Sequence, residues 1–212
     1  MTHTPESVGL LPRFIVIEGL DGAGTTTQTA ILANRMRENG YTVAHGSEPT
    51  GSPVGVLIRR ALRREIGLSP VSLAYLYAAD RQEHVVDPLR GILAAHEAGW
   101  VLSDRYTYSS LAYQTLECPF DLVQSLNKPF PSPGTVVFLD TSPEVAATRR
   151  SQRGGEELFD ALELQHRIYE NYQRAFELAA SQGTRIIRVD GNRGLEETAD
   201  TIWKELTNLP IF

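Results

Sequence analysis

An apolar run of four residues followed by a glycine-rich segment is the feature that most restricts the fold of this chain. Residues 14–17 read Phe-Ile-Val-Ile, a mostly β-branched stretch that predicts a strand buried on both faces, as in a parallel sheet. Three glycines follow between positions 19 and 24, and residues 25–39 then predict a helix that ends before Gly40. A strand, a tight turn and a helix in this order direct backbone N–H groups and the positive end of a helix at one point, which suits a phosphate group.

The remainder of the chain alternates between strand and helix patterns. Four more strands are predicted, at residues 41–44, 100–102, 135–139 and 185–189. Further helices are predicted at residues 54–64, 73–97, 108–116, 143–150, 162–181 and 195–206. Pro88 is expected to kink or split the longest of them. This alternation predicts a doubly wound α/β sheet with right-handed crossovers.

The domain organisation is expected to be simple. Residues 1–12 are expected to form a loose tail, and residues 13–212 a single domain. Residues 128–134, which include three prolines, are expected to form a loop.

Composition excludes several classes of protein. The net charge of −6 argues against a general nucleic-acid binder, although a local cationic pocket would still accept a small anion. Cys118 is the only cysteine, which excludes an intrachain disulfide and a multi-cysteine metal site. No apolar run approaches the roughly 18 residues of a membrane span, and the first dozen residues lack the apolar core of a signal peptide. We therefore expect a cytoplasmic protein without a membrane or nucleic-acid partner.

The glycine-rich segment matches the P-loop pattern of nucleotide-binding proteins at all but one position. The residues expected to bind ATP are Gly19, Asp21, Gly22, Ala23, Gly24, Thr25, Thr26 and Thr27. Thr26 occupies the position whose hydroxyl binds Mg²⁺, the expected cofactor, but Thr25 stands where the pattern has lysine. Lys128 and Lys204 are the only lysines, so a compensating cation should be an arginine. The alternative is a plain glycine-rich turn without a ligand.

A second group of polar residues follows the strand predicted at residues 100–102. Asp104, Arg105 and Tyr106 come just past its carboxyl end, and in an open α/β sheet such residues face the ligand crevice. Residues 102–114 resemble the signature of the thymidylate kinases, in which Asp-Arg-Tyr is followed by a spaced serine and then by Ala-Tyr or Ala-Phe. Four further segments of the chain also resemble that family: residues 18–24, 48–55, 76–81, and 138–140 together with 143–145.

The resemblance covers nearly the whole chain from Arg13. It implies a P-loop NTPase-type α/β fold, with a parallel five-stranded sheet flanked by helices and a short lid. It also implies phosphoryl transfer from MgATP to dTMP by a homodimer. Two alternatives remain. A deoxynucleoside kinase acting on thymidine would need a carboxylate base, whereas Arg105 suits a monophosphate acceptor. A non-catalytic nucleotide-binding module would explain the missing lysine, but Thr26, Asp104 and the arginines of the lid argue against it.

The resemblance also assigns an acceptor site. Tyr77 would stack on the base, and Arg81, four residues later on the same helix face, would donate to a base oxygen such as O4 of thymine. Arg105 would bind the acceptor phosphate, and Asp104 would orient Mg²⁺ through water. The other implied contacts are Asp21 with the 3′-hydroxyl, Tyr113 beside C2′, Ser110 and Gln114 at the base edge, and the Glu48-Pro49 segment. The structural alternatives are core aromatics, ion pairs and a turn-forming aspartate.

A lid is expected over about residues 149–160. Phosphoryl transfer needs a cation near the transferred group, and Ala23 leaves the phosphate loop without an arginine there. The resemblance therefore makes Arg153, and after it Arg149, the catalytic arginines, with Arg105 and Asp21 as the further catalytic residues. The alternative is a solvated helix end whose cations complement the helix dipole.

Two features concern the cations near the acceptor phosphate. Arg59, Arg60, Arg63 and Arg64 form a dense basic run, for which a solvated helix face is the expectation. Ser47 stands where the family usually has arginine, just before the Glu-Pro pair. Thr50 or an arginine of the following helix is expected to replace that phosphate contact.

Overall fold

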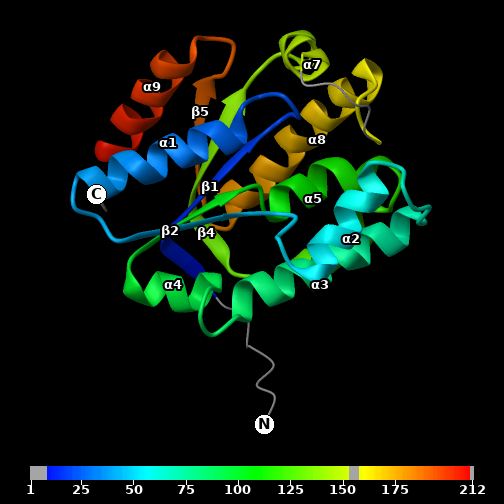
Figure 1. The fold of residues 1–212 in the computed structure, drawn as a ribbon, viewed down its shortest axis with the longest axis horizontal. Coiled ribbons are helices and arrows are strands. Elements are labelled where there is room, and N and C mark those ends of the chain that lie inside the picture. Colours follow the sequence, from blue (N-terminus) through cyan, green and yellow to red (C-terminus); the bar gives the residue numbers. More distant parts are fainter. Residues whose placement is uncertain (1–8, 153–157, 211–212) are drawn as a thin grey trace.

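A computed structural model describes residues 9–152 and 158–210 of the chain (Figure 1). Its centre is a sheet of five parallel strands in the order β2-β3-β1-β4-β5. The strands are β1 (Leu10–Gly19), β2 (Val43–Ser47), β3 (Trp100–Asp104), β4 (Ser132–Asp140) and β5 (Arg185–Asp190). The predicted α/β fold, with a parallel five-stranded sheet flanked by helices, is therefore confirmed.

Helices cover both faces of the sheet (Figure 1). One face is covered by α1 (Thr25–Glu38) and α9 (Leu195–Thr207). The other face is covered by α3 (Pro70–Val86), α4 (Ile92–Ala98), α5 (Thr107–Tyr113), α6 (Phe120–Asn127), α7 (Pro143–Ser151) and α8 (Leu162–Ser181). The remaining helix, α2 (Pro53–Leu62), packs against α3, and a short 3₁₀ turn (Gln114–Leu116) extends α5.

The central strand β1 contributes to two hydrophobic cores. Phe14 and Val16 belong to the core beneath α5 and α8, whereas Ile15 and Ile17 belong to the core beneath α1 and α9. All four side chains are at most 1% exposed. The apolar run is thus buried on both faces, as its composition predicts.

The start of β1 corrects two expectations. The strand begins at Leu10, so the last three residues of the expected loose tail are strand. Leu10 and Leu11 pair with Ser132 and Pro133 of β4, which starts inside the segment expected to be a loop. The pairing is irregular between Leu11 and Ile15. Pro12 lies in this interval, and proline is tolerated at such irregular positions of a sheet.

The longest predicted helix is split into α3 and α4. Asp87 accepts hydrogen bonds from the backbone N–H groups of Leu89 and Arg90, at 2.8 and 3.0 Å, and this turn replaces the helical hydrogen bonds around Pro88. Helix α6 was not predicted, because its eight residues are too few to show a clear period. None of the helices in the described ranges combines the length and the apolar character that crossing a bilayer requires.

The strand register brings three loops to one edge of the sheet. Asp104, the last residue of β3, pairs with Ile17 of β1 and with Ser47 of β2. The backbone N–H groups of Arg105 and Glu48 then donate to the carbonyls of Ile17 and Asp104, at 2.9 and 3.0 Å. Because the strand order reverses at β1, the crevice at this edge is where such sheets bind ligands.

Candidate active site

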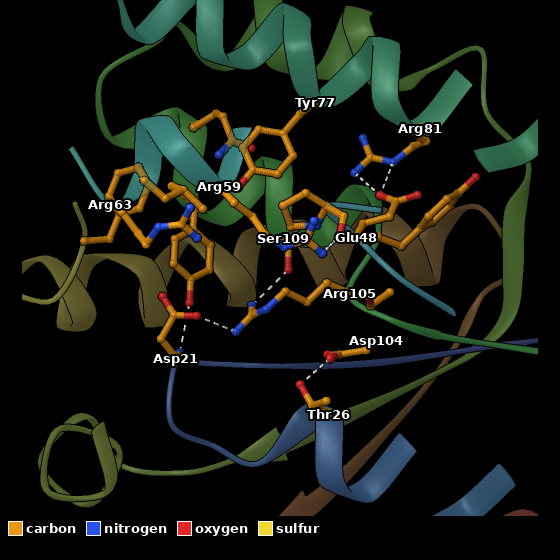
Figure 2. Close-up of a pocket in the computed structure, with 17 residues that line it drawn as sticks. Asp21, Thr26, Glu48, Arg59, Arg63, Tyr77, Arg81, Asp104, Arg105 and Ser109 are labelled. Carbon is orange, nitrogen blue, oxygen red and sulfur yellow. Dashed lines mark hydrogen bonds and ion pairs between the residues drawn. The ribbon is translucent and has the colours of Figure 1, made fainter. Parts of the chain in front are cut away.

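A cavity of about 370 Å³ opens at this edge of the sheet (Figure 2). Its volume lies within the range of small-molecule sites. The residues assigned from the sequence that line it are Asp21, Thr26, Glu48, Pro49, Tyr77, Arg81, Asp104, Arg105, Tyr113 and Gln114. The other lining residues are Ser47, Arg59, Leu62, Arg63, Tyr106, Ser109 and Phe159. The residues expected to bind an acceptor therefore surround one cavity, with the exception of Ser110.

Arg105 reaches from the end of β3 towards the phosphate loop (Figure 2). Its Nη2 lies 2.7 Å from Asp21 Oδ1, and its Nη1 donates to the carbonyl of Gly19 at 2.9 Å. The hydroxyls of Ser109 and Tyr172 each lie 3.1 Å from the same Nη1. The backbone of Arg105 has a φ of 71°, a left-handed conformation that costs a non-glycine residue about 1–3 kcal/mol. This turn directs a cation at the loop that is predicted to bind phosphate.

Beneath Arg105, the fully buried Glu18 holds the turn together. Its carboxylate accepts hydrogen bonds from the backbone N–H groups of Tyr106 and Ser109, at 2.9 and 3.1 Å. The hydroxyls of Ser109 and Tyr172 donate to it at 2.5 and 3.0 Å. Burial raises the pKa of Glu18 to about 7, while the positive charge of Arg105 and these hydrogen bonds oppose that rise. Sequence reasoning gave Ser109 and Tyr172 no role. The sequence does place one glutamate, Glu18, directly after an apolar strand run, and this is the signal that could have pointed to the network.

Arg81 and Glu48 form a buried ion pair elsewhere on the cavity wall (Figure 2). Arg81 Nη2 lies 2.6 Å from Glu48 Oε2, and the two side chains are 1% and 3% exposed, so the alternative of a surface ion pair is wrong. Arg81 also donates to Asn127 and Ser110. Ser110 thus contacts Arg81 and does not line the cavity, and its base contact stays a prediction. Tyr77 lies one turn before Arg81 and faces the same cavity, as their spacing predicts.

The loop after β2 is fixed by a second buried carboxylate. Asp80 accepts hydrogen bonds from the backbone N–H and the hydroxyl of Thr50, both at 2.6 Å, and from the hydroxyl of Ser52 at 2.7 Å. The Thr50 side chain is therefore engaged within the protein, and it does not line the cavity. Asp80 is a further residue to which the sequence analysis gave no role of its own.

The basic run in and after α2 is not a uniformly solvated face, which corrects the expectation. Arg59 lines the cavity and donates to the carbonyls of Pro49 and Thr50, both at 2.5 Å. Arg63, one turn later, also lines the cavity, because residues four apart share a helix face. Arg60 does not line it. An arginine of the helix after Ser47 does reach the cavity, as one of the two alternatives predicted.

Thr26 and Asp104 mark the end of the cavity nearest the phosphate loop. Thr26 Oγ1 donates to Asp104 Oδ2 at 2.5 Å. Within the described residues, the buried Asp104 Oδ1 has no hydrogen-bond partner. No group of three or more His, Cys, Asp and Glu residues in those ranges could hold a metal ion. The pair nevertheless fits Mg²⁺, which keeps several waters and takes its other ligands from substrate phosphates. Gln114 Oε1, on the same cavity, is also buried without a partner among the described residues.

A second cavity, of about 520 Å³, lies along the phosphate loop. It is lined by Gly22, Ala23, Gly24, Thr27, Gln28, Arg149, Gln152, Gly191, Arg193, Gly194, Leu195 and Thr198. Gly22 and Gly24 have φ values of 91° and 95°, which glycine adopts without strain. Arg149 donates to the carbonyl of Gly191 at 2.8 Å, so it lies at this second cavity and not beside Arg105.

Two further arginines fall within the expected lid. Arg153 lies outside the described residues, and its catalytic role stays a prediction. Arg150, to which the sequence analysis gave no role, donates from Nη1 to the carbonyl of Asp21 at 2.5 Å. Its Nε lies 3.1 Å from Asp160 Oδ1. Among the α7 arginines that the structure describes, Arg150 is therefore the one that hydrogen-bonds to the phosphate loop.

Comparison with known proteins decides the family. A sequence profile described as "Thymidylate kinase" matches residues 17–202, which include the phosphate loop and both cavities. The chain belongs to the thymidylate kinase family. It is thus an enzyme, and the resemblance seen in its sequence segments is confirmed.

Curated relatives agree with this membership of the thymidylate kinase family. The "Putative thymidylate kinase" of Aeropyrum pernix is 35% identical over 86% of this chain and 87% of the relative. The "Thymidylate kinase" of Synechococcus sp. (strain JA-2-3B'a(2-13)) is 36% identical over 90% of this chain and 92% of the relative. The "Probable thymidylate kinase" of Thermococcus kodakarensis is 38% identical over 78% and 84%.

Proposed function

We propose that this member of the thymidylate kinase family transfers the terminal phosphoryl group of MgATP to dTMP, giving dTDP and ADP. The observation that carries the proposal is the pair formed by Arg105 and Asp21. One comes from the end of β3 and the other from the phosphate loop, and both line a cavity large enough for a small molecule. A cation fixed beside a phosphate loop suits an acceptor that already carries a phosphate.

Catalysis in this proposal rests on positioning and charge, without a covalent intermediate on the protein. Arg105 binds the acceptor phosphate and holds it in line with the phosphate loop. Thr26 would offer its hydroxyl to Mg²⁺, and Asp104 would orient the ion through water. When bound, Mg²⁺ neutralises charge on the phosphate oxygens. Arg153 is the cation expected to stabilise the transferred group, because Ala23 leaves the loop without one.

The base of the acceptor lies, in this proposal, between Tyr77 and the residues around Arg81. Tyr77 offers a ring for stacking, and Arg81 lies one helical turn away on the same cavity. Gln114 Oε1 is buried without a partner in the described ranges, which supports a role in accepting a hydrogen bond from N3–H of thymine. Tyr113 is 6% exposed and lines the cavity, where it would crowd a ribose 2′-hydroxyl.

ATP would lie along the opposite side of the phosphate loop, in the second cavity. Gly22, Ala23 and Gly24 line that cavity and present the backbone groups expected to hold phosphates. Arg149 lies on its wall, so a contact with ATP is the role that its position supports.

We place the protein in the cytoplasm under the same proposal. We also propose that it forms a homodimer, and the support for this is an exposed apolar face of α3. Val71, Tyr75 and Val86 of α3 are 40%, 54% and 41% exposed. Their spacing of four and eleven residues places them on one helix face. Apolar side chains gathered on one exposed face are typical of a surface that meets another subunit.

The direct test compares dTMP with thymidine as the acceptor while ADP release from MgATP is followed. We expect turnover with dTMP and none with thymidine, because the cavity offers Arg105 for a phosphate. Faster turnover of thymidine would favour a deoxynucleoside kinase. Binding of both nucleotides without ADP release would favour a non-catalytic module.

A further inference from the structure

Asp21 is held at three points by residues from other parts of the chain. Its carboxylate pairs with Arg105 at 2.7 Å (Figure 2), and its backbone N–H donates to Tyr113 Oη at 3.0 Å. Its backbone carbonyl accepts a hydrogen bond from Arg150 Nη1 at 2.5 Å. Two of these partners line the acceptor cavity, whereas Arg150 comes from α7. The peptide groups on both sides of Asp21 are thus fixed from two directions.

Arg150 is itself anchored by Asp160. Its Nε lies 3.1 Å from Asp160 Oδ1, and its Nη2 donates to the Asp160 carbonyl, also at 3.1 Å. Its side chain is only 13% exposed. This one guanidinium therefore joins α7 and Asp160 to the phosphate loop.

The phosphate loop also packs directly on α7. A Cβ atom at Gly22 would lie 2.4 Å from the carbonyl oxygen of Ala146 and 3.0 Å from Arg150 Cγ. Only glycine permits so close an approach at this position, which also has a φ of 91°. A shift of α7 along its axis would therefore be transmitted to the loop by packing as well as through the hydrogen bond of Arg150.

The contacts of Arg150 indicate that it positions other groups and does not bind substrate itself. It is not among the residues that line either cavity, and Asp160 offsets its charge. Its neighbour Arg149 points instead to Gly191 at the second cavity. The two adjacent arginines of α7 therefore serve different sides of the phosphate loop.

We propose that Arg150 is a positioning residue that couples α7 and the ATP site to the acceptor site through the Asp21 peptide. The inference rests on the proposed function, since Asp21 is assigned to the acceptor. Binding at coupled sites is reciprocal, so a nucleotide that binds in the second cavity beside α7 should tighten acceptor binding. Loss of Arg150 should remove most of that gain, while ATP affinity changes little.

The test measures the dissociation constant of dTMP by calorimetry, with and without a saturating non-hydrolysable ATP analogue and Mg²⁺. In the unmodified protein, the analogue should tighten dTMP binding about fivefold or more, the lower end for coupled sites. In Arg150→Gln, the ratio should fall towards one. Arg150→Lys, which keeps one charged donor, should restore part of it. This rescue separates positioning from a merely structural role.

Arg35→Gln is a matched control. Arg35 also donates to one backbone carbonyl, that of Ala199 at 3.4 Å, and pairs with one aspartate, Asp200 at 2.7 Å. It joins α1 to α9 and lines neither cavity. This variant should keep the coupling ratio of the unmodified protein.

Two results would overturn the inference. One is an equal coupling ratio in Arg150→Gln and the unmodified protein, and the other is no coupling in the unmodified protein. Failure of the unmodified protein to bind dTMP at all would instead contradict the proposed function. The same comparison with the monophosphate that does bind would then decide the role of Arg150.

Discussion

Arg105 and Asp21 form an ion pair that joins the turn after β3 to the phosphate loop, with 2.7 Å between Nη2 and Oδ1. Their side chains are 16% and 32% exposed, so both remain accessible from the acceptor cavity. The pair places a cation where a phosphate acceptor and the phosphate loop would meet. The guanidinium is already oriented by Gly19, Ser109 and Tyr172, which lowers the cost of ordering it on binding.

Arg105→Ala should weaken acceptor binding specifically. A charge-assisted hydrogen bond to phosphate contributes about 1.5–3 kcal/mol. The KM for dTMP should therefore rise roughly tenfold or more, at about 1.4 kcal/mol per decade, while the KM for ATP changes little. Steady-state kinetics with each substrate varied in turn measures both constants. An unchanged KM for dTMP would count against the assignment of Arg105.

Arg63→Gln and Arg60→Gln provide a matched pair for the basic run. Both arginines are 48% exposed and both pair with Glu65, at 2.7 and 3.3 Å, but only Arg63 lines the cavity. Arg63→Gln should raise the KM for dTMP about three- to tenfold, less than the loss of Arg105 because solvent screens an exposed cation. Arg60→Gln should change it less than about twofold. Equal effects in the two variants would favour the original interpretation, in which the basic run is a solvated helix face.

Part of the acceptor cavity was predictable because Asp104 and Arg105 come at the end of a strand. Carboxyl ends of neighbouring parallel strands meet at one edge, so Arg105 was expected to face the phosphate loop once the strands were recognised. The four-residue spacing of Tyr77 and Arg81 likewise fixed one shared helix face. The other acceptor contacts, among them Glu48, Tyr113 and Gln114, were expected only from the resemblance to the thymidylate kinases.

The supporting contacts were not predictable because they join distant segments. Tyr172 bonds to Glu18 across 154 positions, and Arg150 reaches Asp21 across 129 positions. A tyrosine on the apolar face of α8 has the pattern of a core aromatic, and nothing in the sequence reveals the partner of its hydroxyl. Two adjacent arginines at the end of α7 also gave no sign that they point to different sides of the loop.

The threonine at the lysine position should leave the enzyme active. Thr25 is 5% exposed and carries no charge, so we expect an arginine to supply the side-chain charge that the lysine would have provided. Thr25→Lys should raise kcat/KM for ATP by less than about tenfold, the low end of what one charge-assisted bond provides. Thr25→Met, of similar length without the charge, separates charge from bulk. An inactive natural protein made active by Thr25→Lys would show that no arginine compensates.

Glu18 should make stability depend on pH. Its pKa is raised from an ordinary value of 4.5 to about 7 by burial, so the folded state keeps a proton that the unfolded state has lost between these values. The contribution of Glu18 is therefore complete below pH 4.5 and is lost as the pH rises towards 7, with a slope of up to about 1.4 kcal/mol per pH unit. Urea unfolding of the natural protein and of Glu18→Gln across this window measures it. Parallel curves for the two proteins would show that Glu18 is ionised in the fold.

The choice of acceptor is the central claim, and ADP release from MgATP with each nucleoside monophosphate in turn tests it most directly. We expect the highest kcat/KM with dTMP, because Arg81, Gln114 and Tyr113 surround a cavity suited to thymine on a deoxyribose. dUMP should react more slowly, because it lacks the methyl group that would pack against the cavity wall, and dCMP, dGMP and AMP should hardly react. If AMP or CMP proves to be the best acceptor, the assignment of this cavity to dTMP is wrong.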